Sequence, residues 1–155
     1  MAKGAFDFTD VFQDIEKGIV NVLADKGNQE AGQEIFANAT KELVYPFYQP
    51  TQYERRMAGG GLADPNNYEI TSEGLTTTIL NNTESNYGQP KPSGGYINDI
   101  IEGGSGYEWE KSEIYQQQPY PRPFMDEATN RYAEYLLAMI GIMVFDGSGS
   151  GAAYA

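Results

Sequence analysis

The sequence predicts an α+β domain, in which a small antiparallel β-sheet packs against N-terminal helices and a long C-terminal helix, with long extended loops between them. Three observations support this fold class. Apolar residues recur at helical spacing from Phe8 onward, β-branched residues gather in Leu75–Leu80, and Leu136–Phe145 is almost entirely apolar. The intervening stretches are rich in proline, glycine and tyrosine, which is typical of extended loops. With 155 residues, the chain is long enough for one domain with a sizeable core.

The first helix is predicted from a stripe of apolar residues along Phe8–Leu23. Asp7 is the expected N-cap, and Gly27 is the expected signal for the end of this helix. The stripe can belong to the core or to a surface that binds a partner, and we expect core. A second helix is predicted over Glu30–Leu43. It is expected to end there because Pro46 disfavours helical backbone at the residue before it. The two helices form either a helical hairpin or one broken helix.

A β-hairpin is predicted from two short segments, Tyr68–Thr71 and Leu75–Leu80, with a turn at Ser72–Gly74. The polar stretch Asn81–Gly95 is predicted to be a loop, and its length suggests a role in binding or assembly. The apolar patch Tyr96–Glu102 is either a strand or a short helix, and two glycines end it.

The last helix is predicted to begin with Pro123 at its first position, with Asp126 and Glu127 in its first turn. Its apolar second half is expected to be buried, either inside the domain or against another subunit. We expect one domain over residues 1–145 and a flexible Gly/Ser-rich tail over 146–155, which is either an assembly arm or a segment added by cloning. The expected core comprises Phe12, Ile15, Ile19, Leu23, Ile35, Leu43, Ile70, Ile79, Phe124, Leu136 and Ile140.

The composition excludes several classes of chemistry. The chain has no cysteine and no histidine, which excludes disulfides, thiolate nucleophiles, histidine bases and most transition-metal sites. Its net charge of -12 and its scattered basic residues disfavour a broad surface for duplex DNA. It contains no apolar run long enough for a secretory signal or a membrane span, so we expect no membrane partner.

Two segments could carry chemistry, and neither pattern is complete. Gly59–Gly61 resembles a phosphate-binding loop, but it lacks the Lys-Ser/Thr that follows such a loop and does not follow a strand. The carboxylates of Glu102–Glu113 could bind a divalent metal or act on a glycan, but their spacing matches no calcium loop and defines no carboxylate pair. We therefore expect no catalytic, metal-binding or cofactor-binding residues, no cofactor and no enzymatic activity.

The order of motifs carries a family resemblance. Tyr53-Glu-Arg55-Arg56 leads to Gly61-Leu62, the hairpin follows, Ile100-Ile101-Glu102-Gly103 comes next, and Arg122-Pro-Phe-Met-Asp-Glu-Ala128 opens the last helix. This order resembles the head–tail joining (neck, tail-completion) family of long-tailed bacteriophages, over roughly Phe8 to Phe145. Arg122 to Ala128 matches the family pattern Arg-Pro-Phe-x-x-x-Ala at every fixed position. Two motifs depart from the family: its Arg-Thr-Gly-x-Leu turn is lengthened by Met57–Gly60, and Gly104-Ser105 stands where Gly-Thr is usual.

The resemblance implies a structural virion protein that forms a homo-oligomeric ring at the head–tail junction. DNA would pass through the lumen without sequence-specific binding. The implied partners are further copies of the chain and other phage neck, portal-adaptor and tail proteins. The protein would be made in the cytoplasm of the bacterial host and would function in the virion. The alternatives are a capsid decoration or adaptor protein and a small carboxylate-dependent hydrolase.

Contacts between subunits are expected in the tyrosine- and proline-rich stretches Tyr45–Leu62, Asn81–Gly95 and Gly106–Pro121, because tyrosine supplies a large contact area at low entropic cost. These stretches could instead be ordinary surface loops. Arg122 and Pro123 could instead serve only to cap and aim the last helix. The candidate subunit-interface residues are Tyr48, Tyr53, Arg55, Arg56, Leu62, Trp109, Tyr120, Arg122 and Phe124.

Overall fold

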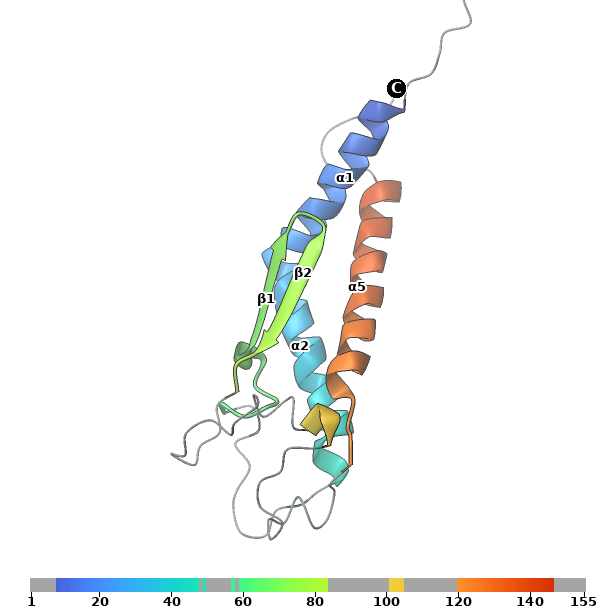
Figure 1. Cartoon of the computed structure of the whole chain (residues 1–155). Helices are drawn as coiled ribbons and strands as arrows, with labels where there is room; N and C mark the ends of the chain where they lie inside the picture. The colour runs from blue at the N-terminus through green and yellow to red at the C-terminus, as the bar shows by residue number, and fades with distance from the viewer. Residues whose placement is uncertain are drawn as a thin grey trace, which may run out of the picture.

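The computed structural model of the chain describes residues 8–47, 49, 57, 59–83, 101–104 and 120–146, with the backbone alone for 145 and 146. The elements follow in the order α1 (Thr9–Ala24), α2 (Lys26–Leu43), η1 (Tyr45–Phe47), η2 (Pro65–Asn67), β1 (Tyr68–Glu73), β2 (Thr76–Asn81) and α5 (Phe124–Asp146). The β-hairpin lies against α1 and α2, and α5 runs beside the same two helices (Figure 1). The predicted α+β class is confirmed.

Helices α1 and α2 form one broken helix, since α2 continues in the general direction of α1 (Figure 1). The break is at Asp25, whose backbone is extended and whose carboxylate accepts a hydrogen bond of 2.9 Å from the amide of Asn28. This side chain caps α2 and starts it earlier than predicted. Gly27 was therefore wrongly predicted to end the first helix, because it lies in the first turn of α2. The predicted N-cap Asp7 lies outside the described residues.

The predicted hairpin is present, with a shorter turn. Strands β1 and β2 pair antiparallel with Ile70 opposite Ile79. The turn consists of Gly74 and Leu75, and Gly74 has a positive φ of 57°. Because glycine supplies this conformation at little cost, the chain reverses in two residues, and Ser72 and Glu73 extend β1 instead of forming the turn.

The main core lies where the hairpin, α2 and α5 meet. Its centre holds three aromatic rings: the centroid of Phe36 lies 5.4 Å from that of Tyr68 and 6.4 Å from that of Tyr132. Gly32 of α2 allows this close approach, since a Cβ there would lie 2.6 Å from the Cδ1 atom of Ile70. The sequence pattern assigned none of these three rings to the core.

The predicted core is confirmed in part. Leu23, Ile70, Phe124 and Leu136 are buried. Others are half-buried: Ile19, Ile35, Leu43, Ile79 and Ile140. Two predictions were wrong, because Phe12 and Ile15 of α1 are 67% and 37% exposed. In Figure 1, the N-terminal end of α1 extends past the end of α5 and past the hairpin, so the elements that cover the rest of the stripe do not reach it. Within the described residues, no helix is sufficiently long and apolar to span a membrane.

Candidate functional site

Segments far apart in the sequence meet at the C-terminal end of α2. They are the glycine-rich turn, 59–64, the short helical segment 101–104, and residues 120–124, which lead into α5. We call this meeting point the junction. A second cluster of buried apolar side chains holds it together, formed by Val44, Leu62, Ile101 and Phe124. Parts of three motifs that resemble those of phage neck proteins, at Leu62, Ile101 and Phe124, therefore lie at one place.

The glycine-rich turn folds around the carboxylate of Asp64. The amide of Gly60 donates a hydrogen bond of 2.7 Å to Oδ2, and the amide of Asn66 donates one of 3.0 Å to Oδ1. These backbone donors, that of Asn66 first, hold the pKa of Asp64 below its usual value. Gly60 has a φ of 80°, which brings its amide to the carboxylate. The amide that a phosphate-binding loop would offer to an anion is therefore used by the chain's own carboxylate.

The turn is anchored to α2 and β1 through buried hydroxyl groups. The hydroxyl of Tyr68 donates a hydrogen bond of 2.9 Å to the carbonyl oxygen of Leu62. It also lies 2.8 Å from the hydroxyl of Thr40, with which it shares a hydrogen bond. Burial raises the pKa of Tyr68 to about 12, because the charged phenolate would be poorly solvated there. The neutral tyrosine thus links the turn, α2 and β1.

The segment 101–104 caps the start of α5. The carboxylate of Glu102 accepts hydrogen bonds of 2.9 Å from the amide of Met125 and 3.2 Å from the amide of Asp126. The amide of Arg122 donates a hydrogen bond of 3.0 Å to the carbonyl oxygen of Ile101. A carboxylate at a helix N-terminus satisfies amides that have no partner within the helix and interacts favourably with the helix dipole. Glu102 therefore joins the segment to α5.

Sequence reasoning missed this role of Glu102 and grouped it with the acidic stretch that follows. One signal was present: the predicted start of the last helix, Arg122-Pro123, has no serine, threonine, aspartate or asparagine to cap it. A helix start without its own capping residue leaves its first amides free for a side chain from another segment. The sequence alone does not say which acidic or polar side chain supplies it.

Gly104 allows the same segment to lie against the chain that enters α5. Its φ is +60°, and a Cβ at this position would overlap the backbone atoms of Tyr120 and Pro121. Both the conformation and the contact exclude larger residues. Gly104 is the glycine of the Gly104-Ser105 pair, which stands where the neck family has Gly-Thr, so the structure gives this glycine a physical reason.

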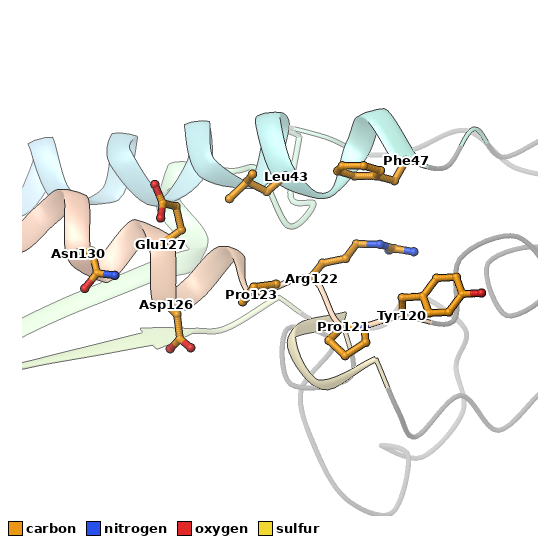
Figure 2. A pocket seen from close by; sticks show the side chains of 9 residues that line it. All are labelled: Leu43, Phe47, Tyr120, Pro121, Arg122, Pro123, Asp126, Glu127 and Asn130. Carbon is orange, nitrogen blue, oxygen red and sulfur yellow. The ribbon is translucent and has the colours of Figure 1, made fainter.

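A groove of about 620 Å³ lies beside the junction, between the end of α2 and the start of α5. Figure 2 shows Leu43 and Phe47 on the α2 side and Asp126 and Asn130 on the α5 side. The side chain of Arg122 points toward the rings of Phe47 and Tyr120. The groove is open and lined by both apolar and charged side chains.

The structure separates the predicted interface residues into groups. Several lie outside the described residues: Tyr48, Tyr53, Arg55, Arg56 and Trp109. Tyr120 is 64% exposed at the groove, whereas Leu62, Arg122 and Phe124 are buried within the subunit. The assignment of these residues to a contact between subunits stays a prediction.

The chemistry at the junction is that of backbone and carboxylate hydrogen bonds. The carboxylates of Asp64 and Glu102 both accept from main-chain amides. In the part of the chain that the structure describes, no group of three or more possible metal ligands is close enough to hold an ion. What this arrangement can do is fix the relative position of α2, the hairpin and α5.

Comparison with known proteins identifies the family. No curated protein and no solved structure shows a significant similarity to the chain. The model of one family, YomN, matches residues 7–140. The match begins just before α1, includes the hairpin and the whole junction, and ends within α5. It covers most of the chain, and the chain therefore belongs to the YomN family, which derives from Bacillus phages.

Proposed function

We propose that this chain is a structural protein of a tailed phage particle that forms a homo-oligomeric ring at the head–tail junction, with DNA passing through the ring. The phage origin of its family supports a role in the phage. The order of its motifs, which resembles that of neck proteins, supports a position at the head–tail junction. The observation that carries the proposal is that the glycine-rich turn, Glu102-x-Gly104 and Arg122-Pro-Phe124 meet in one buried junction.

The geometry of the junction suits a ring subunit. A closed ring of identical subunits uses heterologous contacts, and it closes only if the angle between the two contact surfaces is correct. The buried cluster and the Glu102 cap fix the direction in which α5 leaves the end of α2. A subunit stiffened in this way keeps its contact surfaces at a constant angle.

The charge of the chain suits the passage of DNA. With 22 acidic and 10 basic residues, the chain has few cations that could hold phosphates in place. An acidic lumen repels the duplex and lets it slide. Other neck, portal-adaptor and tail proteins then contact the ring from above and below, in the assembled virion rather than in the host cytoplasm where the chain is made.

The test is to remove the chain from a phage that encodes it. The expected result is DNA-filled heads and separate tails that do not join, with joining restored when the chain is supplied in trans. Cryo-electron microscopy of the complemented particles should show a ring at the head–tail junction. Density or antibody label spread over the capsid shell would instead identify a decoration protein, and absence of the chain from purified particles would overturn the proposal.

A further inference from the structure

Two buried polar side chains lie where the chain leaves the hairpin. Asn81, the last residue of β2, is 4% exposed, and Thr83 is 2% exposed. The backbone amide of Asn82, which lies between them, donates a hydrogen bond of 2.7 Å to the carbonyl oxygen of Asn67, just before β1. This bond fixes the position of the chain after β2, so both side chains are held inside the fold.

The side chain of Asn81 is oriented by a hydrogen bond from Thr83. The backbone amide of Thr83 donates a hydrogen bond of 3.0 Å to Oδ1 of Asn81. A flipped Asn81 amide would place its NH2 group against a second donor, so the assignment of its oxygen and nitrogen follows from this bond. The Nδ2 atom, on the other branch of the amide, therefore keeps both of its hydrogens for other partners.

Each of the two side chains has one polar atom that the protein does not satisfy. Nδ2 of Asn81 and Oγ1 of Thr83 are buried and have no hydrogen-bond partner in the part of the chain that the structure describes. Burying an amide or a hydroxyl without a hydrogen bond is costly, because the group has lost its bonds to bulk water. Most buried polar groups in folded proteins have a partner, so two such atoms on adjacent side chains indicate a site for a small polar ligand.

A third polar group reaches this site from β1. Asn81 pairs with Tyr68 across the hairpin, so the two side chains lie on the same face of the sheet. Burial raises the pKa of Tyr68, and the side chains of Thr40 and Asn81 lower it in part, as expected if both interact with its hydroxyl. This hydroxyl donates its hydrogen to the carbonyl oxygen of Leu62, and its oxygen can still accept.

We propose that one internal water molecule binds between Asn81 and Thr83. It accepts a hydrogen bond from Nδ2 of Asn81, bonds to Oγ1 of Thr83 and donates to the hydroxyl oxygen of Tyr68. Three polar partners are typical of a buried water. The lining side chains are uncharged, which disfavours an ion, and their polar atoms are buried, which excludes a large ligand. The water connects the end of β2 to the tyrosine that links the glycine-rich turn, α2 and β1.

A buried hydroxyl in the main core provides the contrast. The hydroxyl of Tyr132 also has no hydrogen-bond partner among the described residues. A Cβ at Gly32 would lie 2.8 Å from Cζ of Tyr132, the ring atom that carries the hydroxyl, and 2.6 Å from Cδ1 of Ile70. The ring also packs edge-on against Phe36. These neighbours offer no side-chain hydrogen bond, and a buried water needs two to four partners, so we expect this site to be dry.

The first experiment compares Thr83→Val with Tyr132→Phe in the full chain by thermal unfolding. Each substitution removes one buried hydroxyl and closely preserves the shape of the side chain. Thr83→Val removes a partner of the water, so we expect Tm to fall by about 2–6 °C. Tyr132→Phe removes a hydroxyl that has no partner, so Tm should stay the same or rise.

The second experiment is a crystal structure of the full chain and of two variants at position 83. In the unmodified chain we expect a water peak at hydrogen-bond distance, roughly 2.7–3.2 Å, from both Nδ2 of Asn81 and Oγ1 of Thr83. Thr83→Ser is the matched control, because it keeps the hydroxyl and should keep the water. In Thr83→Val the peak should be missing.

Two results would overturn the water site. One is an unmodified chain in which Asn81 and Thr83 are ordered and no water peak lies between them, including the case in which their side chains turn to bond protein groups. The other is a rise in Tm for Thr83→Val like that expected for Tyr132→Phe, which would show that this hydroxyl is also dry. Neither result depends on whether the chain forms a ring, so the proposed function is tested separately.

Discussion

The apolar stripe of α1 is buried at one end of the molecule and exposed at the other. At the packed end, which comprises the main core and the junction, the stripe of α1 reaches Leu23 and is covered by the hairpin and α5. At the projecting end, which is the start of α1, the equally apolar side chains of Phe8, Phe12 and Ile15 face solvent. Figure 1 shows the reason, because α1 continues beyond the elements that cover its second half.

The periodicity of an amphipathic helix shows which side of the helix is apolar. It does not show whether the rest of the chain covers that side. The prediction that the first stripe is core was right for its second half and wrong for Phe12 and Ile15. An uncovered continuation of a core stripe is a candidate contact surface, since large exposed apolar patches are uncommon on isolated proteins.

The sharpest contrast between the two ends comes from matched phenylalanine substitutions. Phe36 is fully buried, so Phe36→Ala should lower the free energy of unfolding by about 3–5 kcal/mol through lost burial and a cavity. Phe12→Ala should change it by no more than about 0.5 kcal/mol, since the side chain is mostly exposed. Urea unfolding at a concentration where the chain is monomeric measures both. Equal losses would mean that Phe12 packs within its own subunit.

The second contrast concerns two glycines with nearly equal φ. Gly104→Ala should destabilise the fold by roughly 2–5 kcal/mol, because the left-handed backbone strains alanine and its Cβ meets the chain at Tyr120 and Pro121. Gly74→Ala has the same strain with open space around the Cβ and should cost only about 1–2 kcal/mol. Thermal unfolding compares them. If Gly104→Ala costs no more than Gly74→Ala, segment 101–104 does not lie against the start of α5.

The stability of the fold at alkaline pH tests whether the hydroxyl of Tyr68 is buried in the packed end. Its pKa in the folded chain is about 12, above the ordinary value of 10.0, so the unfolded chain loses this proton first as pH rises. The neutral tyrosine contributes its full stabilisation below pH 10.0. The free energy of unfolding then falls by about 2–3 kcal/mol as the pH rises from 10.0 to about 12. Tyr68→Phe should lack this loss, although it should start about 1 kcal/mol less stable because hydrogen bonds are removed. Parallel stability curves for the two proteins above pH 10.0 would contradict the burial of this hydroxyl.

The smallest expected effect comes from the helix cap. Glu102→Ala removes the acceptor for two amides of α5 and should cost roughly 0.5–2 kcal/mol. Glu16→Ala, on the exposed surface of α1, is the control, with an expected change within about 0.5 kcal/mol. Hydrogen exchange at Met125 and Asp126 gives a local measurement. If their amides exchange at unchanged rates in Glu102→Ala, the carboxylate is not their cap.

Parts of the junction were predictable and parts were not. The acidic first turn of α5 was predicted correctly from Asp126 and Glu127, because a helix start leaves a local pattern. The pairing of Glu102 with that same turn was not predicted, since its partners lie 23 and 24 residues further along the chain. The role of Tyr68 was missed for a similar reason: its strand position was predicted, but its contacts with Thr40 and Leu62 were not.

Local order in this protein follows from residues that are neighbours in the chain. The helices and the hairpin arise from hydrogen bonds and apolar spacing within a few positions, so their presence can be derived without a fold. The cap of α2 at Asp25 is equally local, although the sequence analysis placed the start of that helix too late. Which apolar faces are covered, which carboxylate caps α5 and why Gly104 must be glycine all depend on segments brought together from distant positions. Those contacts depend on how the helices and hairpin pack in three dimensions, and no short-range pattern encodes that packing.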